Sequence, residues 1–270
     1  MRRAAMMIGA VAVFVIPASA FQALAQNRSS AAATAPVLST APAPVVPESA
    51  DRLLKQMSDY IGSAEHFTFR ADVTFDHVLP SGQKLQFSAT EEVALERPNG
   101  LYIEWSSDLG QRQFWYDGKA MTIYDPEAAF YGVDAAPPGI DAMLDRLITQ
   151  LDFTPPLSDF LYSEPYKSVR GAIQYGFPTG ETEIDGRSCR VLAFVDKNID
   201  WQIWIDTGAQ RVPCKLLITY KTHPAQPQFS AVFSDWDFSP RIAASTFAPD
   251  LPPGTEAIPL ATVTAAAGSK

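Results

Sequence analysis

The chain has 270 residues and a formal net charge of −9, with 30 acidic and 21 basic residues. A nucleic-acid-binding surface needs clustered Lys and Arg, and because the sequence contains no such cluster we expect no nucleic-acid partner. An acidic surface is also repelled by anionic lipid headgroups. The charge does not oppose binding of an uncharged apolar ligand.

The first 25 residues have the pattern of a secretory signal peptide. Arg2 and Arg3 precede an apolar run that ends at Ile16, which is shorter than the roughly 20 residues of a membrane-spanning helix. Small residues predict cleavage after Ala20 or Ala25, and no cysteine at either site could carry a lipid. We therefore expect a soluble periplasmic protein with no transmembrane segment.

Composition divides the chain into four segments. Residues 1–25 form the predicted signal peptide. Residues 26–48 are dominated by Ala, Pro, Ser and Thr without an amphipathic period, which predicts a disordered linker. Residues 261–270 are expected to form a disordered tail. The remaining residues, 49–260, are enough for one domain with a sizeable core, which we expect to be monomeric.

Hydrophobic periodicity predicts a mainly β domain with a few helices. Apolar helical faces run through 53–61 and 140–151, and a shorter helix is expected at 157–161. Elsewhere the period is two. The predicted strands lie near 66–77, 85–96, 101–105, 111–116, 120–124, 128–132, 169–177, 189–195, 200–206, 212–220 and 229–236. These roughly eleven strands in meander order predict an unclosed antiparallel β-barrel with helices covering its concave face.

Arg97 is the most informative single residue of the predicted sheet. It has the same parity as Phe87 and Leu95, so it points to the apolar face at the end of its strand. An unpaired charge there is costly, and backbone carbonyls of the covering helices are candidate acceptors. Alternatively, the side chain extends from the rim into water. Glu91 shares the apolar face, where we expect a tyrosine hydroxyl or water to satisfy it.

Several segments resemble known families. ERPNGLYIEW and YDGKAMTIYDPEAAFYG, from Glu96 and Tyr116 onward, resemble the Arg-Pro-Asn and Asp-Gly-Lys…Tyr-Asp-Pro pattern of the lipoprotein carriers with the LolA/LolB-like fold. EIDGRSCRVLAFVDKNIDWQIWID and VPCKLLITYKTHPAQPQFSAVFSDW are similar to a family of predicted periplasmic proteins of unknown function that is grouped with those carriers. The resemblance implies an apolar cavity that accepts acyl chains, and it implies that Arg97 ties a helical lid shut.

The implied partner is a lipid or an acylated molecule, including a lipoprotein. Besides Arg97, the candidates for the cavity or its lid are Phe69, Phe75, Phe87, Trp105, Phe114, Tyr116, Met143, Leu147 and Trp201. Aromatic strands are also common in ordinary cores. If the barrel is filled in this way, the protein would act through contacts with other envelope proteins.

Catalytic and metal-binding patterns are scarce in the sequence. The three histidines are His66, His77 and His223, and the first two have opposite parity on one predicted strand. No catalytic or phosphate-binding motif is present. We therefore expect no enzymatic activity, no metal and no cofactor, and a periplasmic hydrolase is the weakest alternative.

The only two cysteines, Cys189 and Cys214, raise the question of a disulfide. An oxidising compartment favours a bridge. The predicted strands oppose it, because the two residues would lie two strands apart and offset along the strands. That separation is about 14 Å, whereas a bridge needs Cα atoms within about 7 Å. The sequence leaves the bridge open.

Overall fold

The computed structural model describes residues 46–261 of the chain. The predicted signal peptide, most of the predicted linker and nearly all of the predicted tail lie outside these residues. The predicted start of the domain at residue 49 stays a prediction. Val46 is buried against the core, and the first helix, α1 (Glu48–Gly62), begins one residue before Ser49.

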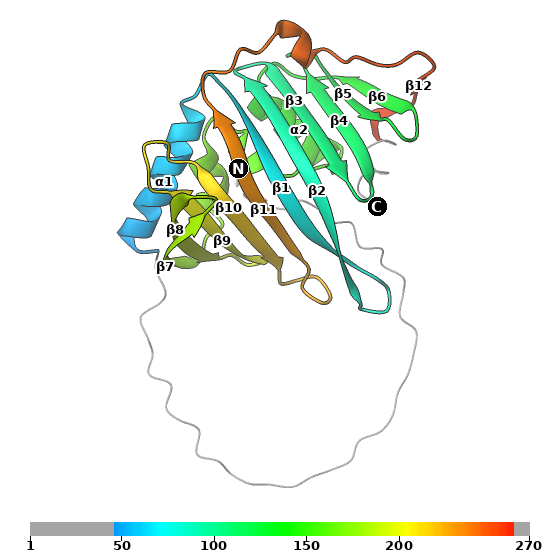
Figure 1. Ribbon diagram of the computed structural model, residues 1–270. Coiled ribbons are helices and arrows are strands. Elements are labelled where there is room, and N and C mark those ends of the chain that lie inside the picture. Colours follow the sequence, from blue (N-terminus) through cyan, green and yellow to red (C-terminus); the bar gives the residue numbers. More distant parts are fainter. Residues whose placement is uncertain (1–45, 262–270) are drawn as a thin grey trace, which may run out of the picture.

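A single twelve-stranded sheet forms the body of the domain (Figure 1). Its strands are β1 (His66–Val78), β2 (Lys84–Glu96), β3 (Gly100–Ser107), β4 (Gly110–Tyr116), β5 (Ala120–Asp125), β6 (Phe130–Ala135), β7 (Tyr175–Ile184), β8 (Arg187–Val195), β9 (Ile199–Asp206), β10 (Pro213–Tyr220), β11 (Gln228–Asp237) and β12 (Glu256–Ala257). The spatial order is β12-β6-β5-β4-β3-β2-β1-β11-β10-β9-β8-β7.

This order confirms the predicted unclosed antiparallel barrel. Each half of the chain forms a meander, and the antiparallel pairing of β1 with β11 joins the two halves. The strands β12 and β7 therefore lie at opposite edges of the sheet. The twelfth strand, which the sequence did not predict, is the two-residue β12, and it pairs in parallel with β6.

Along β1 and β2, alternation gives the sheet one largely apolar face. The inward pairs of β1 and β2 are Phe67–Leu95, Phe69–Val93, Ala71–Glu91, Val73–Ala89 and Phe75–Phe87. On the other face Arg70 forms an ion pair with Glu92 at 2.7 Å. Complete burial of one large apolar side chain contributes about 1.5–3 kcal/mol. The inward row therefore fixes the register, since a slip of one residue would expose it.

The helices contribute to the same core. They are α1, α2 (Ile140–Gln150), the 3-10 turn η1 (Ser158–Phe160), α3 (Pro165–Arg170) and the 3-10 turn η2 (Ala244–Phe247). In Figure 1, α2 lies behind β3 and β4, and its apolar stripe is buried in the core. The strand predicted at 169–177 is wrong up to residue 174: residues 169 and 170 end α3, and the strand β7 begins only at Tyr175. Pro165 at the start of α3 has a φ angle preset for a helix.

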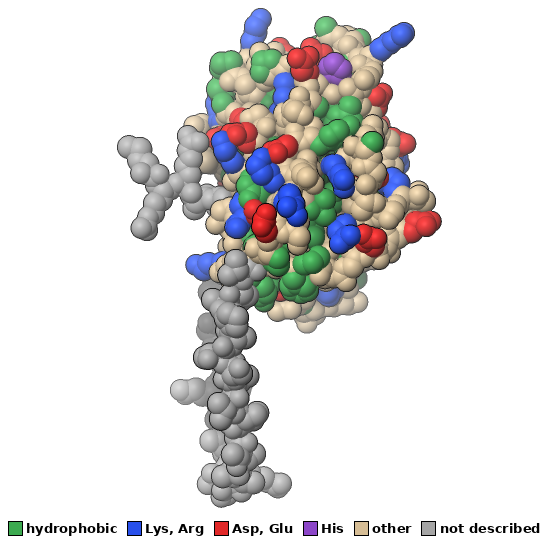
Figure 2. All heavy atoms as spheres, turned by 90° about the vertical axis from the view of Figure 1, so that its left-hand side faces the viewer, with side chains coloured by type: hydrophobic (Ala, Val, Ile, Leu, Met, Phe, Trp, Pro, Cys, Tyr) green, Lys and Arg blue, Asp and Glu red, His purple; other side chains and the backbone are tan. Residues whose placement is uncertain are grey.

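Helices α1 and α3 are tied together by polar contacts. Asp51 of α1 accepts hydrogen bonds from the Tyr166 hydroxyl at 2.8 Å and from Nε of Arg170 at 2.5 Å. Seen from the side that carries α1, the surface intersperses basic and acidic side chains around hydrophobic ones (Figure 2). The contact between α1 and α3 fixes the segment that follows α2 at its far end.

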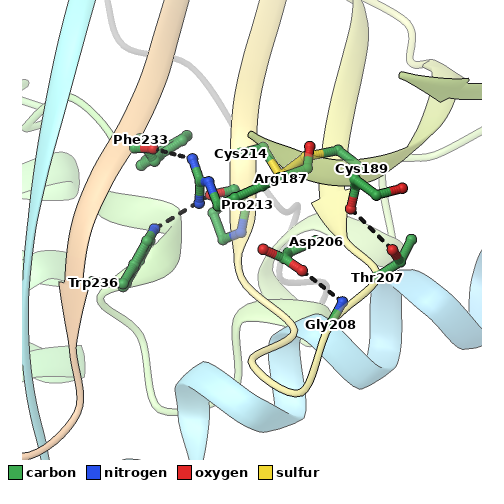
Figure 3. The surroundings of a disulfide bond; sticks show 10 residues. Arg187, Cys189, Asp206, Thr207, Gly208, Pro213, Cys214, Phe233 and Trp236 are labelled. Carbon is green, nitrogen blue, oxygen red and sulfur yellow. Dashed lines mark hydrogen bonds between the residues drawn. A yellow bond between two sulfur atoms is a disulfide. The ribbon is translucent and has the colours of Figure 1, made fainter. Parts of the chain in front are cut away.

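Cys189 and Cys214 form a disulfide with a Cα–Cα distance of 6.7 Å, so the predicted separation was wrong (Figure 3). The cysteines do lie two strands apart, on β8 and β10. However, Cys189 pairs with Asp206 at the end of β9, and the register shifts at Cys214. A bulge bends its strand and re-aims side chains, which here removes the expected offset. The indole of Trp236 donates to the carbonyl beside the bulge, that of Pro213, at 3.3 Å.

A covered apolar cavity as the candidate functional site

A cavity of about 270 Å³ lies on the concave side of the sheet. Its sheet wall joins both halves of the barrel and includes Phe75, Ile103, Trp105, Phe114, Trp201, Ile203, Leu216 and Ile218. Leu54 and Met57 of α1 contribute to the wall as well. Small-molecule sites in proteins are mostly apolar and typically measure roughly 300–1,000 Å³. The cavity therefore has the chemistry of a ligand site and slightly less than the usual volume.

The segment between α2 and α3 covers this cavity. Every residue from 152 to 160 lines it. Pro155 and Pro156 lack backbone N–H groups, and Leu157 has a left-handed backbone with φ of 54°, which is unfavourable for a non-glycine residue. A cover built in this way has few backbone hydrogen bonds of its own. Its position therefore depends on the burial of its apolar side chains and on how its two ends are attached. We call residues 140–161 the lid.

Arg97 attaches the far end of the lid to the barrel rim. Its Nη1 donates to the carbonyl of Leu161 at 2.9 Å, and its Nη2 donates to that of Tyr162 at 3.0 Å. Its Nε donates to the carbonyl of Ala64 at 3.1 Å. Burial lowers the pKa of Arg97, and the negative charge of Asp141 opposes this effect. The guanidinium thus bonds backbone carbonyls and does not extend into water.

The residues beside Arg97 attach the near end of the lid. The carbonyl of Pro98 accepts a hydrogen bond from the backbone N–H of Ile140 at 2.9 Å. Oδ1 of Asn99 accepts one from the N–H of Gly139, also at 2.9 Å. The Arg-Pro-Asn sequence therefore bonds both ends of the lid, and we call Arg97, Pro98 and Asn99 the latch.

The structure separates the predicted site residues into three groups. Phe75, Trp105, Phe114 and Trp201 line the cavity. Phe69, Tyr116, Met143 and Leu147 are buried in the core and lie off the cavity wall, where the Tyr116 hydroxyl donates to the carbonyl of Pro137 at 2.7 Å. Phe87 is half-buried beside Phe75, and Arg97 lies at the rim. A ligand contact by any of these residues stays a prediction.

Several cavity residues were missed by sequence reasoning. On β10, Leu216, Ile218 and Tyr220 alternate with outward residues, and this period of two could have identified them. The irregular segment from 152 to 160 has no period, so only its prolines marked it as something other than a helix. Asp159, near the end of that segment, gave no sequence indication of lining an apolar cavity.

Glu91 is a buried carboxyl group without a partner. It is fully buried on β2, opposite Ala71 and Trp105, and within residues 46–261 neither of its oxygens has a hydrogen bond. No tyrosine hydroxyl of this part of the chain bonds to it, so the tyrosine expected as one of its two possible partners is wrong. Burial raises the pKa of Glu91 well above its ordinary value. The folded protein therefore favours the neutral acid at this position.

The free energy of unfolding should consequently fall as the pH rises. In the unfolded chain Glu91 loses its proton above about pH 4.3, whereas the folded protein retains it. The contribution of Glu91 to the free energy of unfolding is thus fully present below that pH. It is lost as the pH rises through the raised pKa that Glu91 has in the folded protein. Glu91→Gln should remove this loss. At neutral pH its free energy of unfolding should therefore be about 1–3 kcal/mol higher than that of wild type.

Urea unfolding over a pH series measures this difference. The control is Glu92→Gln, which alters the exposed neighbour that pairs with Arg70. If the free energy of unfolding depended on pH in the same way for wild type and Glu91→Gln, the prediction would be wrong, because Glu91 would then titrate in the folded protein as it does in the unfolded chain.

A comparison with protein families identifies the chain. Fold and site together define an open β-barrel with a covered apolar cavity. Residues 50–261 match the family described as "Predicted periplasmic protein (DUF2092)", and the chain belongs to this family. No match was found among curated proteins. Within residues 46–261 no helix has the length and apolar character needed to cross a membrane.

Solved structures with a similar fold come from several bacteria. The Mycobacterium tuberculosis lipoprotein LppX is 11% identical, with 72% of this chain and 97% of that chain covered and a TM-score of 0.44. An uncharacterized conserved protein from Thermus thermophilus is 9% identical, with 78% of this chain and 99% of that chain covered and a TM-score of 0.44. A LolA superfamily protein from Nitrosomonas europaea is 9% identical, with 74% and 97% covered and a TM-score of 0.36. At these values the similarity does not extend to function.

Proposed function

We propose that this protein is a non-catalytic periplasmic binding protein or carrier for a lipid or another acylated molecule. The observation that carries the proposal is the apolar cavity beneath a lid that the latch holds at both ends. A carrier must shield an apolar chain from water and still release it. A space enclosed by a few hydrogen bonds at the rim meets both requirements.

The cavity suits an acyl chain in chemistry and size. Each methylene group that leaves water contributes about 0.8 kcal/mol. A methylene group occupies roughly the volume of a water molecule, about 30 Å³, so 270 Å³ accommodates on the order of ten such groups. A longer chain or a second chain would require the lid to move outward. The same space argues against the alternative of a completely filled barrel.

Titration with an environment-sensitive fluorescent acyl probe tests this function. Wild type should bind the probe, and Ile218→Trp should weaken binding at least roughly tenfold, because an indole fills the cavity in place of the chain. The matched control is Val133→Trp, which adds the same group at an exposed position on β6. Because overpacking can cost about 1–3 kcal/mol, thermal melting must show that Ile218→Trp remains folded. Equal binding by all three proteins would refute the cavity as the site.

A further inference from the structure

The cavity opens toward the end of the barrel that lies away from the latch. β1 begins beside the latch, because its first residue pairs with the residue before Arg97. Its inward residues are buried as far as Val73, whereas Phe75 and His77 beyond it are half-buried and line the cavity. Ser107 and Gly110, in the turn at the far end of β3, line it as well. We call this end of the cavity the mouth.

A guanidinium group lies in the wall of the mouth. Arg112 of β4 lines the cavity two residues after Gly110. It has the parity of Phe114 and Tyr116, which are buried in the core, and it pairs across the strands with Trp105. Its side chain is only 15% exposed. The residue therefore points inward, where a charge is costly unless it is used.

The three nitrogens of Arg112 differ in what they contact. Nη1 donates to the carbonyl of Gln111 and pairs with Oδ2 of Asp125 at 2.9 Å. Nε is unpaired but fully covered, so no ligand can reach it. Nη2 has no hydrogen bond or ion pair with residues 46–261, and it is not among the covered unpaired atoms of this part of the chain. Nη2 is therefore accessible and can donate.

Asp125 holds Arg112 in place and leaves Nη2 unused. Its side chain is 2% exposed. Oδ1 of Asp125 accepts hydrogen bonds from the backbone N–H groups of Glu127 and Ala128 at 3.0 Å each, in the turn between β5 and β6. The carboxylate is thus fixed by the backbone, and it orients the guanidinium in turn. A donor that is already oriented loses less conformational freedom when a ligand binds.

Arginine determines the kind of ligand atom that Nη2 can take. A guanidinium only donates, so its partner must be an acceptor. Among the described residues that line the cavity, Arg112 is the one Lys or Arg side chain, and the carboxylates of Asp152 and Asp159 accept only. Carboxylate, phosphate and ester oxygens are acceptors that are joined to acyl chains. Apolar wall on the inner side of Arg112 suits the chain itself.

We propose that Nη2 of Arg112 donates a hydrogen bond to the polar end of the ligand, which is an acyl chain that ends in a carboxylate, phosphate or ester oxygen. The polar end then lies at the mouth, and the chain extends inward beneath the lid. This inference rests on the proposed carrier function and adds to it the orientation of the ligand and the residue that recognises its polar end.

Competition between compounds that share one hydrocarbon chain tests the assignment. Oleate, oleoyl lysophosphatidate, monooleoylglycerol and 9-octadecene each compete with the fluorescent acyl probe at neutral pH. Arg112→Met keeps a long apolar side chain and removes the donor. It should weaken the compounds that bear oxygen roughly tenfold, the size of a hydrogen bond to a charged group. The affinity for 9-octadecene, which has no oxygen, should not change.

Two further variants separate recognition from folding. Arg112→Met leaves the buried Asp125 without its ion pair, so the double variant Arg112→Met, Asp125→Asn removes that charge too. An asparagine oxygen can still accept from Glu127 and Ala128, and the double variant should show the same loss. Asp125→Asn alone leaves the positive charge of Arg112 unbalanced, so it should bind oleate and lysophosphatidate several-fold more tightly than wild type does.

The matched control is Arg70→Met, which removes an arginine that is paired with Glu92 on the opposite face of the sheet. Its affinities should equal those of wild type. A loss confined to the two anions, or to monooleoylglycerol, would support the site and identify its oxygen. Unchanged affinities in the folded double variant would overturn the role of Arg112 while the carrier function stands. If wild type bound the probe no better than Ile218→Trp does, both would fail together.

Discussion

Replacing Arg97 with leucine should open the lid. The substitution removes the three hydrogen bonds to the carbonyls of Ala64, Leu161 and Tyr162. Hydrogen bonds from a charged donor contribute about 1.5–3 kcal/mol each. Because the three share one side chain, we expect a combined shift of about 3 kcal/mol, or roughly a hundredfold in the population of the open lid. The rest of the barrel should persist, since leucine suits the apolar face of β2.

Hydrogen exchange measures this opening directly. Amides of residues 140–161 should exchange faster in Arg97→Leu, while those of β1 and β2 keep their protection. Arg97→Lys should be intermediate, because one ammonium group cannot reach three carbonyls in the way a planar guanidinium does. Arg52→Leu, on the exposed face of α1, is the matched control. Unchanged exchange in the lid of Arg97→Leu would show that Arg97 does not act as a latch.

Removal of the disulfide should lower stability by a similar amount without affecting the cavity. The bridge closes a loop with a sequence separation of 25 residues, for which the chain-entropy relation gives about 3.5 kcal/mol. For a domain of this size the melting temperature should fall by roughly 7–14 °C. Neither cysteine lines the cavity, so the affinity for an acyl probe should change far less than the stability.

Urea unfolding of the double variant Cys189→Ala, Cys214→Ala, followed by tryptophan fluorescence, measures the loss. Reduced wild type should unfold at nearly the same urea concentration as the variant, since both lack only the covalent link. A variant as stable as oxidised wild type would mean that the bulge at Cys214 holds β8 and β10 in place without the bridge.

Regular strands explain which parts of the site could be predicted. From Leu85 to Leu95 every second residue is apolar except Glu91, and β2 pairs with β1 without a register shift. Parity therefore placed Arg97 on the apolar side of the rim from sequence alone. The same reasoning failed for Cys214, because its bulge has no local sequence pattern and one inserted residue reverses the direction of a side chain.

Parity also cannot tell a cavity wall from a filled core. Phe69 and Phe75 lie on the same face of β1, yet only Phe75 borders the cavity, because Phe69 packs against Phe233 and Trp236. The lid supplies the remaining wall through residues without a period, including Asp159. Alternation within a strand decides which of its residues point to the core. The presence of an empty space depends on how distant segments pack against that face.

Native mass spectrometry of the protein purified from its own envelope tests the central claim most directly. We expect a mature chain that carries one acylated molecule, which organic extraction releases and which Ile218→Trp does not retain. A bare protein mass after gentle purification, together with no uptake of added monooleoylglycerol by wild type, would contradict it.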